Sequence, residues 1–231
     1  MLSSEYIKRA EEMGRNAHAG KTWAAGLPYS EHLERVAVTV RTFLEGRVPE
    51  DVLRNLQAAA WLHDAVEDTG MTLDTVEQEL GPNVRALVWA VTDEPGANRT
   101  ERHARTFPKT KNVPYATALK LADRIVNVEA NVSNRGGIYN MYRKEHDVFF
   151  KALYNPTHDE LEPMWRHLNR LMQIEPSKAA LKLADKIMAN IQSSLSVNAK
   201  FVDTRDTIAA VIEENTPKPD PENPHAGSFG K

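Results

Sequence analysis

The segment AAAWLHDAVEDTG (residues 58–70) decides how this sequence is read. Its alanines and its tryptophan are typical of a buried helix, yet four ionisable residues follow within a few positions. Those four are His63, Asp64, Glu67 and Asp68. Burying an unpaired charge costs stability, so charged groups beside an apolar stripe need a partner. A bound cation is one such partner, and the rest of the chain then has to supply further ligands.

The composition is that of a globular protein with a core. Of 231 residues, 41% are hydrophobic and 26% are charged, which suits one domain or slightly more. No cysteine is present, which excludes disulfides, thiolate metal sites and thiol nucleophiles. A net charge of −3 and a pI of about 6.3 argue against a nucleic-acid partner. Without a membrane-length apolar run or a signal-peptide pattern, we expect a cytoplasmic protein, and the oligomeric state is left open.

Apolar residues recur with helical spacing along most of the chain, and no strand pattern stands out, which predicts an all-α fold. One expected helix runs through His63 to Glu67, with both side chains on or beside its buried stripe. Thr72 is expected to cap the next helix, and Gly81 and Pro82 to divide it from another. Further helices are expected at 5–17, 32–44, 115–133, 138–153, 158–173, 177–196 and 204–214.

Two stretches are expected to be irregular. Residues 93–114 read as a basic loop, because five Lys or Arg residues between positions 99 and 111 face a single glutamate. The C-terminal stretch 216–231 contains four prolines and reads as a disordered tail. The predicted organisation is one domain over 1–196, an extension with a short helix over 197–215, and this tail.

The His-Asp dipeptide occurs three times, so it proves little alone. The pair at 146–147 lies in a stretch whose polar residues are expected to form a solvated face. The pair at 158–159 matches a capping motif after Thr157. Only the pair at 63–64 is surrounded by apolar residues and followed one turn later by Glu-Asp. That pair is therefore the candidate for metal binding.

Two more ligands must come from elsewhere, and the candidates are His32 and Asp123. Mixed nitrogen and oxygen ligands without thiolate suit manganese, iron or magnesium. Four protein ligands on a six-coordinate ion leave room for a water and a phosphate oxygen, as metal-assisted hydrolysis requires. The alternative is a buried polar cluster whose members only pair with each other or with Lys and Arg.

Three segments together resemble a known family: HLERVA (32–37), the block from AAAWLHD to VWAVTDE (58–94), and KLADRIVN (120–127). They are similar to the HD-domain metal-dependent phosphohydrolases, and most to the alarmone hydrolase branch of the Rel/Spo enzymes and their small stand-alone relatives. The resemblance covers roughly residues 10–172 and implies an HD-domain helical bundle.

The resemblance also implies roles for residues of this chain. The implied ligands of a divalent metal, with manganese favoured, are His32, His63, Asp64 and Asp123. Glu67 and Asp68 match the pair that orients or activates the attacking water, and Asn127 matches a residue that contacts the nucleotide. We expect phosphate contacts from the cations Lys21, Arg99, Arg102, Lys120 and Arg124.

Asp185 is the rival of Asp123, because ALKLADKIMAN (180–190) nearly repeats ALKLADRIVN (118–127). Four residues beyond Asp185 stands Ala189, whereas the corresponding residue beyond Asp123 is an asparagine. Asp123 also follows the basic stretch, as the family pattern requires, so we favour it.

The expected substrate is a nucleotide, and the expected reaction removes the 3′-pyrophosphate from guanosine tetra- or pentaphosphate. One departure concerns the turn before the first metal histidine, which is typically Arg-Lys-Ser-Gly-Glu-Pro-Tyr in the family and here reads WAAGLPY (23–29). A second is Val128-Glu129 where the family tends to have Met-Arg. Base selectivity is therefore expected to be weak.

One alternative to this function is an HD-type nucleotidase acting on another nucleotide, such as a deoxynucleoside phosphate. The other is a non-catalytic HD protein that binds a nucleotide or a protein partner.

Overall fold

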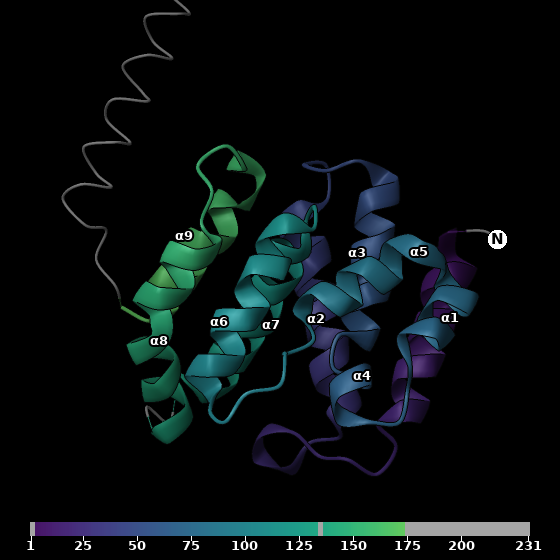
Figure 1. Cartoon of the computed structure of the whole chain (residues 1–231), viewed down its shortest axis with the longest axis horizontal. Coiled ribbons are helices and arrows are strands. Elements are labelled where there is room, and N and C mark those ends of the chain that lie inside the picture. The colour runs from purple at the N-terminus through teal and green to yellow at the C-terminus, as the bar shows by residue number, and fades with distance from the viewer. Residues whose placement is uncertain (1–2, 134–135, 174–231) are drawn as a thin grey trace, which may run out of the picture. The chain divides into compact units, whose positions relative to one another are not determined.

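Amphipathic segments of the chain fold as helices that pack along their apolar faces (Figure 1). The computed structural model describes residues 3–133 and 136–173, and in these ranges the only strand-like pairing is an isolated bridge between Thr22 and Pro28. The all-α prediction is confirmed. The helices are α1 (Ser3–Ala17), α2 (Tyr29–Leu44), α3 (Glu50–Leu62), α4 (Ala65–Asp68), α5 (Leu73–Val91), α6 (Arg99–Asn112), α7 (Ala116–Asn131), α8 (Gly137–Leu153) and α9 (Glu162–Leu171), with short 3-10 turns η1 (Ala24–Gly26) and η2 (Asp159–Leu161).

The C-terminal predictions lie outside the described residues. These are the helices at 177–196 and 204–214, the extension at 197–215, the tail at 216–231, and Asp185. The described residues belong to one compact unit, Met1–Glu175.

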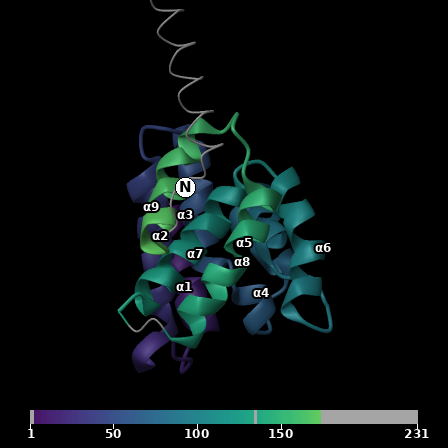
Figure 2. The same ribbon diagram turned by 90° about the vertical axis from the view of Figure 1, so that its left-hand side faces the viewer.

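Helices α2, α3 and α7 form the centre of this unit (Figures 1 and 2). α2 packs against α3 and α7, α3 also packs against α1 and α5, and α7 also contacts α9. Leu33, Leu56 and Leu119, one from each central helix, are fully buried, and each such burial stabilises the fold by about 1.5–3 kcal/mol. Gly14 lets α1 approach α3, because a Cβ there would collide with the carbonyl oxygen of Trp61. The packing thus places α2, the end of α3 and α7 side by side.

One predicted helix is interrupted at the His-Asp motif. α3 ends at Leu62, and α4 begins only after a turn at His63 and Asp64, where Asp64 has φ −101° and ψ −5°. The Nδ1 atom of His63 hydrogen bonds to the Ala60 carbonyl at 2.8 Å, an oxygen that a continuous helix offers to a backbone N–H. The prediction of one helix through Glu67 is wrong, and Glu67 is exposed although His63 is buried.

The predicted basic loop over 93–114 is also wrong, because most of it forms α6. Asn98 Oδ1 accepts from the Glu101 N–H at 3.0 Å, and Glu101 Oε2 accepts from the Ala97 N–H at 3.1 Å. This reciprocal pair starts the helix much as a capping box does. The buried positions of α6 recur at helical spacing, but most of them are polar, so the sequence shows no apolar helical pattern there. These positions are His103, Thr106, Phe107 and Thr110.

Other predictions differ only in detail. Thr72 caps α5 as expected, since its Oγ1 accepts from the Thr75 N–H at 3.1 Å. The expected break at Gly81 is a kink inside α5, where φ is 83° and ψ is 175°. His146 was expected on a solvated face, but it is 3% exposed, so that prediction is wrong. Its helix turns the imidazole toward Phe150, with ring centroids 6.1 Å apart.

Candidate metal centre

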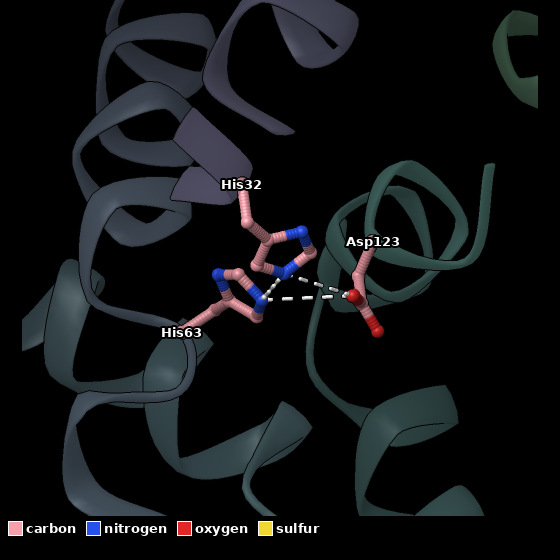
Figure 3. Close-up of side chains that lie close together, drawn as sticks. All are labelled: His32, His63 and Asp123. Carbon is pink, nitrogen blue, oxygen red and sulfur yellow. Dashed lines mark hydrogen bonds and ion pairs between the residues drawn. The ribbon is translucent and has the colours of Figure 1, made fainter. Parts of the chain in front are cut away.

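Three separate elements bring two imidazoles and a carboxylate together. His32 lies in the first turns of α2, His63 directly follows α3, and Asp123 lies in α7 (Figure 3). The two Nε2 atoms are 3.2 Å apart, and Asp123 Oδ1 lies 3.4 Å from His32 Nε2 and 3.7 Å from His63 Nε2. These ligand atoms all lie within 4.8 Å of one another. The side chains therefore converge on one point.

Asp64 adds a fourth donor to the same place. Its Oδ2 is 3.0 Å from His63 Nε2 and 3.5 Å from His32 Nε2. Tyr29 Oη donates to that oxygen at 2.6 Å, which orients the carboxylate. The four predicted ligands thus meet, and we call His32, His63, Asp64 and Asp123 the ligand cluster.

Burial makes the charges of the ligand cluster interdependent. His32 and His63 are 1% and 3% exposed. Burial works to lower the pKa of His63, but the carboxylates of Asp64 and Asp123 outweigh it and hold that pKa well above its ordinary value. Burial works to raise the pKa of Asp64, but His63 and His32 hold that pKa well below its ordinary value. The two carboxylates thus require positive charge at this point, from protons or from a cation.

The donor geometry fits a cation. The hydrogen bond from His63 Nδ1 to the Ala60 carbonyl places the ring proton on Nδ1, which leaves the Nε2 lone pair facing the cluster. His32 Nε2 faces the same point, so two imidazole nitrogens and two carboxylates point inward. Nitrogen and oxygen donors without sulfur suit a divalent metal of intermediate or hard character.

The predicted water-activating residues lie at the edge of this cluster. Glu67 Oε2 accepts from the backbone N–H of Asp93 at 3.0 Å. Desolvation raises the pKa of Glu67 above its ordinary value of 4.5, and the Asp93 carboxylate adds to the shift. The Nζ of Lys21 donates to the Asp68 carbonyl and lies 3.8 Å from Asp68 Oδ2. Both acidic residues are exposed, so they are accessible from solvent.

Asn127 sits directly against the cluster. Its Nδ2 donates to Asp123 Oδ1 at 2.6 Å, and its Oδ1 accepts from Trp23 Nε1 at 3.2 Å. Sequence analysis missed the contacts of Tyr29 and Trp23 with this site. The available signal was their place in the turn before His32, where Tyr29 keeps the family pattern and Trp23 departs from it.

Two of the predicted phosphate-binding cations share one acidic partner, Asp93. Lys120 Nζ donates to the Val91 carbonyl at 2.8 Å and lies 3.5 Å from Asp93 Oδ1. Arg102 Nε lies 3.9 Å from Asp93 Oδ2 and has no hydrogen-bond partner among the described residues. Since Asp93 also donates its backbone N–H to Glu67, these cations lie close to the predicted general base.

Arg99 and Arg124, two more of these cations, share Glu145. Arg99 Nε donates to Glu145 Oε1 at 2.8 Å, and Arg124 Nη2 lies 3.5 Å from Glu145 Oε2. Arg124 is 3% exposed, and its guanidinium carbon lies 3.8 Å from the centroid of the Phe149 ring. Burial lowers the pKa of Arg124 to about 10. Arg124 is therefore packed in the interior of the protein, against Phe149 and Glu145.

A cavity of about 460 Å³ lies between α6 and α8, apart from the ligand cluster. Phe107, Pro108, Val148 and Ala152 form much of its wall, and none of the predicted site residues lines it. The predicted chemistry thus does not lie in this cavity.

Comparison with known proteins places this chain in a family, the HD domain, and finds relatives that are named as hydrolases. The family described as HD domain matches residues 10–150. The chain is 26% identical over 183 residues to guanosine-3′,5′-bis(diphosphate) 3′-pyrophosphohydrolase of Aquifex aeolicus, an alignment that covers 68% of this chain and 25% of that protein. It is 39% identical over 104 residues to the same-named hydrolase MESH1 of Mus musculus, over 45% of this chain and 55% of the relative. The chain therefore spans about half or less of these relatives.

A solved structure supports the fold. It is described as a metazoan ortholog of SpoT that hydrolyzes ppGpp, and it superposes with a TM-score of 0.60 over 74% of this chain and 97% of the other. The two sequences are 22% identical, so the similarity bears on the helical fold alone. Within the described residues, no helix is both long and apolar enough to cross a membrane.

Proposed function

This chain belongs to the HD-domain family, and we propose that it is a phosphohydrolase that removes the 3′-pyrophosphate from guanosine 3′,5′-bis(diphosphate). Dependence on a divalent metal follows from the family. The observation that carries the proposal is the convergence of two buried imidazoles and two carboxylates from separate elements. The names of the relatives supply the substrate. In this proposal residues 1–196 form the catalytic domain.

The ligand cluster holds the metal in this proposal, and manganese is the ion that the family resemblance favours; donors of nitrogen and oxygen alone are compatible with it. Such an ion polarises a phosphate oxygen and lowers the pKa of a water molecule when bound. Tyr29 and Asn127 hold the two carboxylates in place through hydrogen bonds of 2.6 Å each. Partners of this kind fix ligand orientation and tune ligand basicity.

Glu67 serves as the general base. Its pKa is raised, chiefly by desolvation, which makes it a better proton acceptor than an ordinary glutamate. The Asp93 N–H holds one of its oxygens in place. Asp68, whose main-chain carbonyl accepts from Lys21, helps to orient the water.

Cations beside Glu67 bind the phosphates. Arg102 and Lys120 lie against Asp93, and Lys21 lies beside Asp68, the residue that follows Glu67. Arg102 and Lys21 are 41% and 40% exposed, so they can turn toward a phosphate at small cost. We assign Arg99 a weaker contribution, because its Nε already donates to Glu145, and Arg124 the weakest, because it is buried.

The test is product analysis with the purified full chain. Metal-free protein is incubated with guanosine 3′,5′-bis(diphosphate), with and without Mn²⁺, beside a panel of 5′-nucleotides and deoxynucleotides. We expect pyrophosphate and guanosine 5′-diphosphate, formed only with metal. Release of phosphate from 5′-nucleotides alone would indicate the HD-type nucleotidase. Saturable nucleotide binding without turnover would indicate a non-catalytic HD protein.

The adenosine counterpart of guanosine 3′,5′-bis(diphosphate) belongs in the same panel. The turn WAAGLPY lacks the basic and hydroxyl residues of the family pattern, so we propose weak discrimination between the two bases. A strong preference for guanosine would show that base recognition comes from other residues.

A further inference from the structure

We infer that Trp23 is a positioning residue of the metal centre: its indole N–H, acting through Asn127, fixes the carboxylate of Asp123, and its ring supports the imidazole of His32. This inference rests on the proposed metal-dependent function and adds a residue of this chain's own divergent turn to it.

The first observation is an uninterrupted chain of hydrogen bonds. Trp23 Nε1 donates to Asn127 Oδ1 at 3.2 Å, and Asn127 Nδ2 donates to Asp123 Oδ1 at 2.6 Å. An indole N–H can only donate, and an ionised carboxylate can only accept. With the amide turned over, its NH₂ would face the indole N–H and its oxygen would face the carboxylate. Trp23 and Asp123 therefore impose the same orientation on the Asn127 amide, and the indole N–H locks it from the far side.

The second observation is the ring contact with another member of the ligand cluster. The centroids of the Trp23 and His32 rings lie 5.0 Å apart, with the planes inclined by 37°. His32 Nδ1 is buried and has no hydrogen-bond partner in the described part of the chain, so on that side ring contacts, with Trp23 and Tyr29, help to hold this imidazole. One half-buried indole thus touches one ligand directly and a second through Asn127.

The turn itself holds Trp23 in place. The Trp23 N–H donates to the Leu27 carbonyl at 2.7 Å, and the Gly26 N–H donates to the Trp23 carbonyl at 2.9 Å. Gly26 adopts a φ of 78°, a left-handed conformation that glycine adopts without strain. The Arg35 guanidinium carbon lies 5.5 Å from the centroid of the indole. Indole position is therefore set by the protein, with no need of a nucleotide base to stack on it.

The test is a calorimetric titration of Mn²⁺ into the metal-free full chain. Trp23→Phe keeps a ring beside His32 but loses the N–H, and we expect its Kd for Mn²⁺ to rise about tenfold, as for partners of metal ligands in general. Trp23→Ala loses both contacts and should weaken binding further. The matched control is Trp89→Phe. It changes an exposed tryptophan of α5 that lies against Lys109 of α6. Its Kd should equal that of wild type.

A double-mutant cycle separates positioning from general packing. If Trp23 acts through Asn127, then Trp23→Phe should add nothing to the loss caused by Asn127→Ala. Additive losses would overturn this route. In kinetics, Trp23→Phe should lower kcat at saturating substrate and limiting metal, and excess Mn²⁺ should restore it. A rise in KM with unchanged metal affinity would instead make Trp23 a substrate-stacking residue and overturn the inference.

The outcomes also separate this inference from the function on which it rests. If wild-type protein binds no Mn²⁺, the proposed function fails and the inference fails with it. If wild type binds Mn²⁺ and Trp23→Phe binds it equally well, only the inference fails. Thermal unfolding of the metal-free variants checks that each one folds.

Discussion

The ligand cluster and the group of predicted phosphate-binding cations on α6 and α7 differ in what satisfies their charges. In the cluster, buried imidazoles and carboxylates point at one another, and the carboxylates demand positive charge. In the cation group, Asp93 and Glu145 each lie beside two of the four cations, so every cation already has a carboxylate within 4 Å. Buried imidazoles held against two carboxylates therefore favour the binding of a cation, whereas a basic stretch of sequence does not by itself indicate an anion site.

The largest expected effect is the loss of a cluster carboxylate. Asp123→Ala should abolish metal-supported hydrolysis, because it removes one of four donors and leaves two imidazoles facing a cavity. The matched control is Asp185→Ala, whose local sequence nearly repeats that of Asp123. It should keep turnover and metal content near wild type. Metal loss in the Asp185 variant with retention in the Asp123 variant would reverse the assignment.

The next effect concerns the edge of the cluster. Glu67→Gln keeps an acceptor for the Asp93 N–H but cannot take a proton, so kcat should fall by roughly 10²–10⁴. Metal content should not change, because Glu67 is outside the ligand cluster. Steady-state kinetics with elemental analysis measures both. An unchanged kcat would show that Glu67 only holds the Asp93 backbone.

The same residue predicts a pH dependence. A general base works in its ionised form, and the pKa of Glu67 is raised above 4.5. Its contribution to kcat is therefore full above that raised pKa and lost as the pH falls through it. The pH profile of Glu67→Gln should lack this acid limb, although its residual rate is low.

Arg124 tests whether a cation of the second group is structural. Arg124→Ala removes the buried partner of Glu145 and should lower the free energy of unfolding by about 3 kcal/mol. Arg124→Met restores much of the volume and should cost less. Denaturant unfolding of the metal-free variants measures the loss. Wild-type stability with a large rise in KM would make Arg124 a phosphate ligand instead.

The smallest effect is expected at the exposed end of the same group. Arg102→Ala should raise KM roughly fivefold, the size expected for about 1 kcal/mol from one exposed charge pair. The effect should shrink with added salt. Arg105→Ala is the control on the same helix, because its Nη1 donates to the Pro95 carbonyl. Equal KM values for the two variants would remove Arg102 from the site.

Sequence analysis could predict the cluster because its residues are costly where they lie. His63 beside Trp61 and a run of alanines demanded a partner, and the structure brings His32 and Asp123 to it. The sequence pattern could not predict the break between α3 and α4, since the break is accompanied by a hydrogen bond from the His63 side chain to the Ala60 carbonyl.

Two other features, helix α6 and the hydrogen bond between Trp23 and Asn127, could not be predicted from the spacing of apolar residues. α6 was hidden because its inward positions carry threonine and histidine, although the Asn98 to Glu101 capping signal was visible in the sequence. The bond between Trp23 and Asn127 joins residues 104 positions apart, so no local periodicity reports it.

The most direct test of the central claim is the binding of Mn²⁺ to metal-free wild-type chain and to His63→Ala, measured by calorimetry and without substrate. The account predicts one tight site per wild-type chain and no measurable site in the variant. Asp147→Ala, a change in the second His-Asp pair on α8, should bind like wild type. Equal binding by wild type and His63→Ala, or no binding by wild type, would contradict the claim that the ligand cluster is a metal centre.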